Sequence, residues 1–234
     1  MITKVYDFAD IAVQAVFRDS YMQELCRDYE TGKTPELMIE VTEEDVKRED
    51  EKSDEQGYPY GYLESLAFYR KFCEKVVERN ILLFHSSVIM VDGQAYVFTA
   101  PSGTGKSTHT SLWRQVFGER AVMINDDKPL FKIEEDSVWA YGTPWDGKHR
   151  ISTNTKAEIK ALCILERGKE NSIQKESFFD AYPFILNQTY RPDDEQGMAK
   201  TLELVNKMMN LLPVYKMKCN ISREAAEMAY NAMK

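Results

Sequence analysis

The feature that most constrains this chain is the segment FTAPSGTGKSTHT at residues 98–110. Its SGTGKS core is that of a Walker A phosphate-binding loop (P-loop). An apolar run at 94–100 precedes it, and an amphipathic run at 107–118, closed by Gly118, follows. A strand, a glycine-bearing turn and a helix form an anion site, because the N–H groups of the turn converge and the helix N-terminus adds its positive end. The segment predicts an α/β protein that binds nucleotide phosphates.

Each position of the loop has an expected role. Lys106 is expected to reach the β- and γ-phosphates, and the Ser107 hydroxyl to bind Mg²⁺. Ala100 occupies the place of the usual first glycine, but this position needs a small residue more than a positive φ angle. ATP and GTP both remain possible ligands. The residues expected to hold the nucleotide are Ser102, Gly103, Thr104, Gly105, Lys106, Ser107 and Thr108.

A second motif, AVMINDD at 121–127, predicts an apolar strand that ends in two carboxylates, Asp126 and Asp127. In P-loop enzymes, a carboxylate at the tip of a neighbouring strand holds Mg²⁺ opposite the loop hydroxyl. The other carboxylate is suited to accept the proton of an attacking hydroxyl. The alternative is an acidic turn without a catalytic role.

Two further segments carry candidate residues. His85 interrupts an apolar run at 81–91, and a hairpin with an Asp92-Gly93 turn would return the chain to the P-loop and bring His85 beside the γ-phosphate. In the loop at 142–150, Lys148 and Arg150 are candidates for stabilising a transferring phosphoryl group. Trp145 is a candidate for stacking on a base or substrate, the alternative being a surface loop with a core tryptophan.

Hydrophobic periodicity predicts a small N-terminal subdomain at 1–60, which includes a charge-dense loop at 41–57, and a nucleotide-binding domain at 61–234. Residues 5–17 fit either a strand or a helix. The expected architecture is a mixed twisted sheet with flanking helices. Beyond the segments above, the pattern predicts a helix from 62, a hairpin at 130–142, strands at 160–168 and 213–219, and helices at 177–190, 197–212 and from an N-capping Ser222.

The composition narrows the classes of partner. The net charge is −8, so the chain has no basic field for nucleic acid or an anionic membrane. No apolar run approaches the roughly 18 residues that span a bilayer, and charges interrupt each apolar stretch near the N-terminus. The four cysteines are widely spaced, which favours reduced thiols over a zinc site. A cytoplasmic protein is expected, and a homo-oligomer remains possible.

The three motifs together resemble one superfamily. A histidine-bearing strand, a hairpin, an SGxGK[ST] loop and a strand ending in Asp-Asp are shared by HPr kinase/phosphorylase and ATP-dependent phosphoenolpyruvate carboxykinase. Here these elements are His85, the loop from Ser102 to Ser107, and Asp126 with Asp127. The resemblance is close over about residues 80–130 and looser elsewhere. It implies an HPr-kinase-like fold of the shorter kind.

The resemblance also implies roles. Lys106 and the loop amides would bind phosphates, Ser107 and Asp127 would hold Mg²⁺, and Asp126 would be the base with help from His85, although the two aspartates could exchange roles. The chain departs from HPr kinase in lacking a clear counterpart of its Arg-Gly-rich segment with a metal-linked glutamate. At 234 residues it also leaves little room for the oxaloacetate-binding segments of the carboxykinase.

Two functions remain open. The first is a Mg-ATP-dependent kinase that phosphorylates a hydroxyl of a protein, a peptide or a small molecule. The second is a nucleotide-binding regulatory ATPase or switch without acceptor chemistry, which would need only one metal-binding carboxylate and a positioned water. The paired aspartates and His85 favour the kinase.

Overall fold

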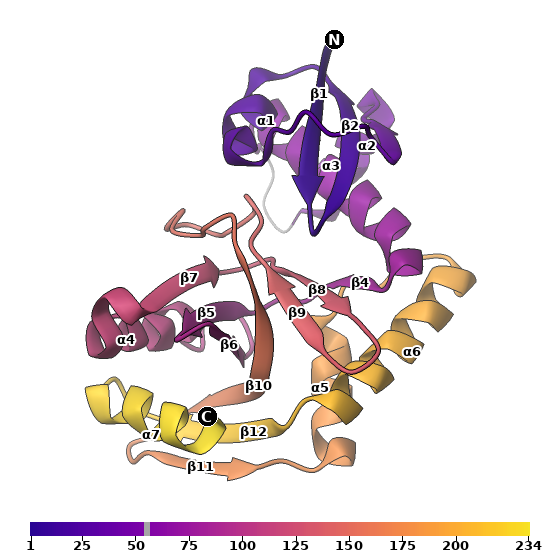
Figure 1. Ribbon diagram of the computed structural model, residues 1–234. Coiled ribbons are helices and arrows are strands. Elements are labelled where there is room, and N and C mark those ends of the chain that lie inside the picture. Colours follow the sequence, from indigo (N-terminus) through magenta and orange to yellow (C-terminus); the bar gives the residue numbers. More distant parts are fainter. Residues whose placement is uncertain (54–56) are drawn as a thin grey trace. The chain divides into compact units, whose positions relative to one another are not determined.

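The computed structural model describes residues 1–53 and 57–234 and divides into two compact units, Met1–Arg79 and Asn80–Lys234 (Figure 1). The boundary expected near residue 60 lies after Arg79. Helix α3 (Tyr60–Val76) belongs to the first unit, because its apolar side packs on the strands there. Phe68 and Phe72 both contact the ring of Phe8 in edge-on geometry.

The first unit is a three-stranded sheet with helices. Strands β1 (Ile2–Phe8) and β2 (Ile11–Phe17) pair antiparallel, and β3 (Leu37–Glu40) adds parallel to β2. The short helix α1 (Ser20–Leu25) comes between β2 and β3. Residues 5–17, which fit a strand or a helix, are two strands joined by a tight turn. Ala9 and Asp10 both have a positive φ there, at 54° and 65°.

The charge-dense segment is helical rather than a loop. Helix α2 (Glu43–Lys52) begins with a capping box, in which the Thr42 side chain and the Asp45 side chain each accept a hydrogen bond from the other's backbone N–H. Acidic residues in the first turn stabilise the helix, because their negative charges lie at the positive end of the helix dipole. Arg70 of α3 then pairs with Glu49 of α2. Of the expected loop, residues 54–56 lie outside the described residues.

The second unit is built on a curled, mixed sheet with the order β4-β8-β9-β10-β6-β5-β7, to which β12 adds on β10 and β11 on β12 (Figure 1). Strand β10 runs parallel to β6 and β12 and antiparallel to β9. The strands are β4 (Ile81–Leu83), β5 (Ser87–Val91), β6 (Gln94–Thr99), β7 (Ala121–Asn125), β8 (Leu130–Ile133), β9 (Val138–Tyr141), β10 (Lys156–Arg167), β11 (Ser172–Lys175) and β12 (Val214–Cys219).

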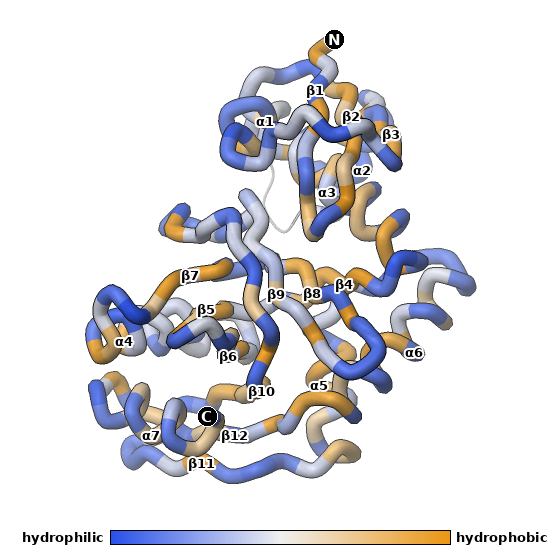
Figure 2. Tube along the Cα trace, in the orientation of Figure 1, coloured by the Kyte–Doolittle hydropathy of each residue, from blue (hydrophilic) through white to orange (hydrophobic). Residues whose placement is uncertain are grey.

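Four helices flank this sheet: α4 (Lys106–Phe117), α5 (Phe178–Gln188), α6 (Glu195–Leu211) and α7 (Arg223–Met233). Helix α4 packs against α7 and against β5, β6 and β7. The core between these elements contains Phe98, Trp113 and Met217, and Figure 2 shows β7 as a largely hydrophobic strand beside it. The other expected strands and helices of this unit are present, but the apolar run at 81–91 forms two strands, β4 and β5, instead of one. Ser222 caps α7 by accepting a hydrogen bond from the N–H of Ala225.

Strand directions bring several chain segments to one edge of the sheet. Because β5 runs antiparallel to β6 and β7, its first residues lie beside the ends of those two strands. The P-loop follows β6, the two aspartates follow β7, and His85 precedes β5. In the described residues, no helix has the length and apolar character needed to cross a membrane.

Candidate active site

The P-loop connects β6 to α4. Gly103 and Gly105 have φ angles of +73° and +123°, which side-chain-bearing residues rarely adopt. A methyl group at Gly103 would meet open space, so the backbone conformation rather than crowding requires glycine there. The N–H of His109 donates to the Gly105 carbonyl at 2.9 Å and closes the first turn of α4. The loop therefore presents a curled backbone at a helix N-terminus.

Lys106 is the buried cation of the loop. Its Nζ donates to the carbonyl oxygen of Ala100 at 3.0 Å, which holds the ammonium group against the loop. Burial lowers the pKa of Lys106, while the negative charges of Asp127 and Asp126 act in the opposite direction. The ammonium group thus lies within electrostatic reach of both aspartates.

Ala100 is a core residue. It is fully buried in the cluster that contains Phe98 and Trp113, and its backbone lies outside the left-handed region. The first position of this loop therefore needs a small side chain that fills space, and it does not need the conformational freedom of glycine.

We expect Ala100→Gly to lower the free energy of unfolding by about 1 kcal/mol, because it removes a buried methyl group and increases the entropy of the unfolded chain. Urea unfolding followed by circular dichroism measures this change. Nucleotide affinity should stay within about twofold of the wild type. An unchanged or higher stability would contradict the packing role of the methyl group.

Asp126 faces the P-loop and is only 6% exposed. Its Oδ1 accepts a hydrogen bond from the Ser87 hydroxyl at 2.5 Å. Burial raises the pKa of Asp126, and hydrogen bonding by the Ser87 and Ser107 hydroxyls offsets part of this effect. The resemblance implies that Ser107 binds Mg²⁺ together with Asp127, but in the structure the Ser107 hydroxyl lies beside Asp126.

Asp127 faces His85 instead. The His85 Nε2 lies 3.2 Å from Oδ1 of Asp127, and the Lys128 Nζ lies 3.0 Å from Oδ2. Burial acts against ionisation of Asp127, but the hydrogen bond with His85 and the charge of Lys128 outweigh it and lower the pKa of Asp127 to about 2. Asp127 is therefore a carboxylate at neutral pH.

His85 lies in the short connection between β4 and β5, not within a strand. Its backbone N–H donates to the carbonyl of Gln188 at 2.8 Å, and its Nδ1 lies 3.1 Å from Oε1 of Gln188. The Thr99 hydroxyl donates to the His85 carbonyl at 3.1 Å. These contacts, from the end of α5 and the end of β6, fix the imidazole beside Asp127.

The turn that carries the aspartates is shaped by Asn125, which the sequence did not single out. Its Oδ1 accepts from the N–H groups of Asp127 and Lys128, both at 2.8 Å, and its Nδ2 donates to the Thr143 carbonyl at 2.9 Å. An asparagine directly before Asp-Asp is a signal for such an Asx turn. The turn directs the two carboxylates to different neighbours, Ser107 and His85.

The loop at 142–150 packs against the aspartates through Gly147, where an added Cβ would lie 3.4 Å from the Cβ of Asp127. Trp145 is buried, so the expected stacking on a base or substrate is wrong. Lys148, His149 and Arg150 are exposed.

Arg167, at the end of β10, is a further residue at the P-loop that the sequence did not indicate. Its Nη2 donates to the Gly103 carbonyl at 2.6 Å and its Nε to the Thr104 carbonyl at 3.2 Å. The guanidinium group thereby fixes two loop peptides from a strand 63 to 64 residues away in the chain. Orienting these carbonyls also orients the neighbouring N–H groups of the loop.

We expect Arg167→Ala to weaken nucleotide binding about tenfold, because two hydrogen bonds that preorganise the loop are lost. The side chain is exposed, so the melting temperature should change little. Titration calorimetry with Mg-ATP measures the affinity, and Arg167→Lys, which keeps the charge but not the two-point geometry, should show an intermediate loss. Equal affinity in Arg167→Ala and the wild type would exclude this positioning role.

Comparisons with known proteins identify no family: no family model and no curated protein matches the chain. Among solved structures, the chain is similar to the Hpr(Ser) kinase/phosphatase from Coxiella burnetii, with 11% identity and a TM-score of 0.36. The match covers 64% of this chain and 95% of that one. A likeness this distant supports no conclusion about activity.

Proposed function

We propose that the chain is a Mg²⁺-dependent phosphotransferase that transfers the γ-phosphoryl group of ATP, or of GTP, to a hydroxyl group. The acceptor hydroxyl belongs to a protein, a peptide or a small molecule. The observation that carries this proposal is the meeting of three groups at one sheet edge: the P-loop with Lys106, Asp126 beside Ser107, and Asp127 paired with His85.

Phosphate binding is the role of the loop amides and Lys106. The backbone N–H groups from Gly103 to Ser107 would surround the β-phosphate, as in other loops of this geometry. Lys106 would exchange its hydrogen bond with the Ala100 carbonyl for the β- and γ-phosphate oxygens. Ser102 and Thr108 remain candidates at the two ends of the loop, and both are exposed.

Ser107 and Asp126 are the proposed Mg²⁺ ligands. This assignment exchanges the roles that the resemblance implies for Asp126 and Asp127. Hydroxyl and carboxylate oxygens suit this hard cation, and the contact between the two side chains supports the pairing. Mg²⁺, when bound, neutralises the charge of the phosphates and so favours transfer. Ser87 would hold the carboxylate of Asp126 in place by its hydrogen bond.

Asp127 is the proposed base, with His85 as its positioning partner. Asp127 and His85 are 26% and 36% exposed at the side chain, so an acceptor can reach them more easily than Asp126. In the transfer, the acceptor oxygen forms a bond to the γ-phosphorus, the bond to the β,γ-bridging oxygen breaks, and the acceptor proton passes to Asp127. Lys148 and Arg150 remain candidates for stabilising the transferring group.

A regulatory ATPase without acceptor chemistry needs one carboxylate at the metal and a positioned water. The second carboxylate, held by its own histidine, favours the kinase.

Transfer of label from [γ-³²P]ATP tests the proposal. The protein is incubated with Mg²⁺ and labelled ATP in the presence of a degenerate serine and threonine peptide library or of a mixture of polyols. Label on a hydroxyl group is the expected result. Label released only as inorganic phosphate would support the regulatory ATPase, and failure to bind both ATP and GTP would overturn both functions.

A further inference from the structure

Helix α5 carries apolar side chains on the side that faces solvent. Four residues at the spacing i, i+3, i+4 and i+7 share one face of the helix and form what we call the α5 stripe: Phe179, Tyr182, Pro183 and Leu186. Phe179 is 85% exposed, Pro183 is exposed, and the other two are half-buried. Ala181 and Ile185 of α5 are buried. A helix that is apolar on both sides is normally covered on both, so the stripe fits a partner.

Pro183 leaves a backbone acceptor at the stripe. It lies inside α5 and has no N–H. In a regular helix, the N–H at this position donates to the carbonyl four residues earlier, which here belongs to Phe179. That carbonyl lacks its helical donor, and the ring of the same residue is largely exposed. An incoming polypeptide can supply both an apolar side chain for the ring and a backbone N–H for the carbonyl. The stripe therefore suits a polypeptide better than a polyol, which has no apolar side chain.

The stripe leads to the proposed base. Gln188, the last residue of α5, accepts the backbone N–H of His85 at 2.8 Å through its carbonyl, and its Oε1 lies 3.1 Å from Nδ1 of His85. The next residue, Thr189, forms an isolated β-bridge with Phe84. These contacts fix the C-terminal end of α5 beside the Asp127–His85 pair. A partner that lies along the stripe therefore meets the pair where α5 ends.

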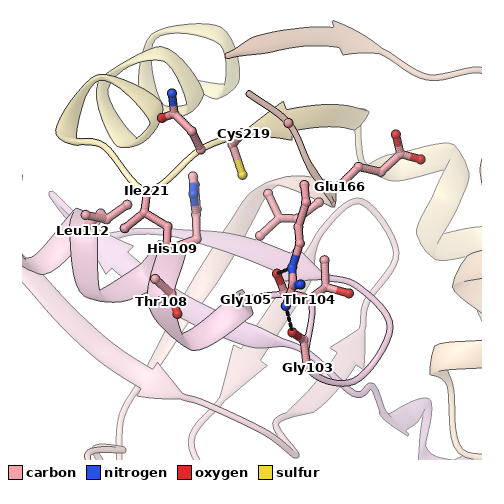
Figure 3. Close-up of a pocket in the computed structure, with 13 residues that line it drawn as sticks. Gly103, Thr104, Gly105, Thr108, His109, Leu112, Glu166, Cys219 and Ile221 are labelled. Carbon is pink, nitrogen blue, oxygen red and sulfur yellow. Dashed lines mark hydrogen bonds between the residues drawn. The ribbon is translucent and has the colours of Figure 1, made fainter. Parts of the chain in front are cut away.

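The cavity beside the P-loop is separate from the stripe. It has a volume of about 560 Å³ and opens between the start of α4 and the ends of β10 and β12 (Figure 3). Residues of the loop and of α4 line part of it: Gly103, Thr104, Gly105 and Thr108. Asp127, His85 and the α5 stripe are not among the described residues that line it. A nucleotide can extend from the loop into this cavity and leave the Asp127–His85 pair open to an acceptor.

We propose that the α5 stripe binds an apolar segment of the acceptor, so that the acceptor is a polypeptide whose serine or threonine hydroxyl is presented to Asp127. The inference rests on the proposed phosphotransferase function. From Phe179 to Gln188, α5 rises about 14 Å at about 1.5 Å per residue, which an extended chain covers with about four residues. Asp127 lies beyond Gln188, on the other side of the His85 ring. An anchor at Phe179 should therefore lie about four to seven residues from the phosphorylated residue.

Two peptide pools test the inference with [γ-³²P]ATP and Mg²⁺. Both carry a fixed central serine or threonine; one has Phe or Leu at the positions about four to seven residues away on either side, and the other has Gln there. At subsaturating concentration, the apolar pool should be labelled at least about tenfold faster, because burial of one such side chain strengthens binding by this factor or more. Equal labelling of the two pools would overturn the docking surface and leave the kinase intact.

A mixture of polyols, assayed in parallel, separates failure of the inference from failure of the proposed function. Label on polyols but on neither peptide pool would overturn the polypeptide acceptor, and with it the inference, while the phosphotransferase would stand. Absence of transfer to peptides and polyols alike would overturn the proposed function itself.

Three variants locate the effect. Phe179→Ala should raise the KM for the apolar pool about tenfold and leave kcat, the KM for the Gln pool and the KM for ATP unchanged. Phe179→Leu, which keeps an apolar side chain, should retain most of the affinity for the apolar pool. Met38→Ala is the matched control, since Met38 is a large apolar residue, 63% exposed on β3, and should change neither pool. Size-exclusion chromatography accompanies the kinetics. A wild-type dimer that Phe179→Ala dissociates, with equal loss on both pools, would assign the stripe to self-association and overturn the inference.

Discussion

Replacing Lys106 by Met is expected to lower the turnover of ATP by about 10²–10³-fold, because the variant loses the cation that stabilises charge on the transferring phosphoryl group. Met keeps the length of the side chain and much of its apolar stem. The ammonium group is buried and its pKa is lowered by burial, so the protein stabilises this charge poorly without a bound anion. The folded state should therefore lose about 1 kcal/mol or less.

Two measurements separate these effects: phosphate release or acceptor labelling for turnover, and urea unfolding for stability. Lys132→Met is the control, since Lys132 lies on β8, pairs with Glu134 and has no contact with the P-loop among the described residues. It should retain wild-type turnover. Full activity in Lys106→Met would show that this lysine does not act on the phosphates.

The two aspartates should respond differently to loss of their charge. Asp127→Asn is expected to lower kcat by about 10²–10⁴-fold and to leave the affinity for Mg-ATP within a few-fold, because only the base is lost. Asp126→Asn is expected to raise the Mg²⁺ concentration needed for half-maximal activity about tenfold or more, because a metal ligand is lost.

Initial rates over a series of Mg²⁺ concentrations, at saturating ATP, distinguish the two variants. Asp136→Asn, at the exposed turn between β8 and β9, is the control and should behave as the wild type. His85→Ala should lower kcat less than Asp127→Asn, since His85 acts through the carboxylate. The reverse pattern, with the metal effect in Asp127→Asn and the kcat effect in Asp126→Asn, would restore the roles implied by the resemblance.

Local sequence patterns predicted most of the second unit. The hairpin of β5 and β6 follows from alternating apolar residues and the Asp92-Gly93 turn, and β7 coincides with the expected run at 121–125. The segment at 41–57 was misjudged because charge density suggested a loop. The capping box of Thr42 and Asp45 and the pairing of Glu49 with Arg70 instead stabilise a helix.

The residues that form the site could be predicted from the sequence where they are neighbours in the chain, as in the P-loop. Which aspartate meets Ser107 depends on the register of β5, β6 and β7 and on the turn made by Asn125, which no local pattern encodes. Arg167 reaches the loop from the end of β10, which pairs with β6, so its contact depends on the sheet order and not on a local pattern. Trp145 was misplaced because its burial depends on such distant contacts.

We infer that the P-loop, Asp126 and the Asp127–His85 pair form one phosphoryl-transfer site. A single-turnover experiment with excess protein, [γ-³²P]ATP and the acceptor mixture of peptides or polyols tests it most directly. The wild type should convert bound ATP to ADP only when Mg²⁺ is present, and Asp127→Asn should bind the same amount of ATP but convert it at least about 100-fold more slowly. Failure of the wild type to retain ATP, or equal conversion by the two proteins, would contradict the claim.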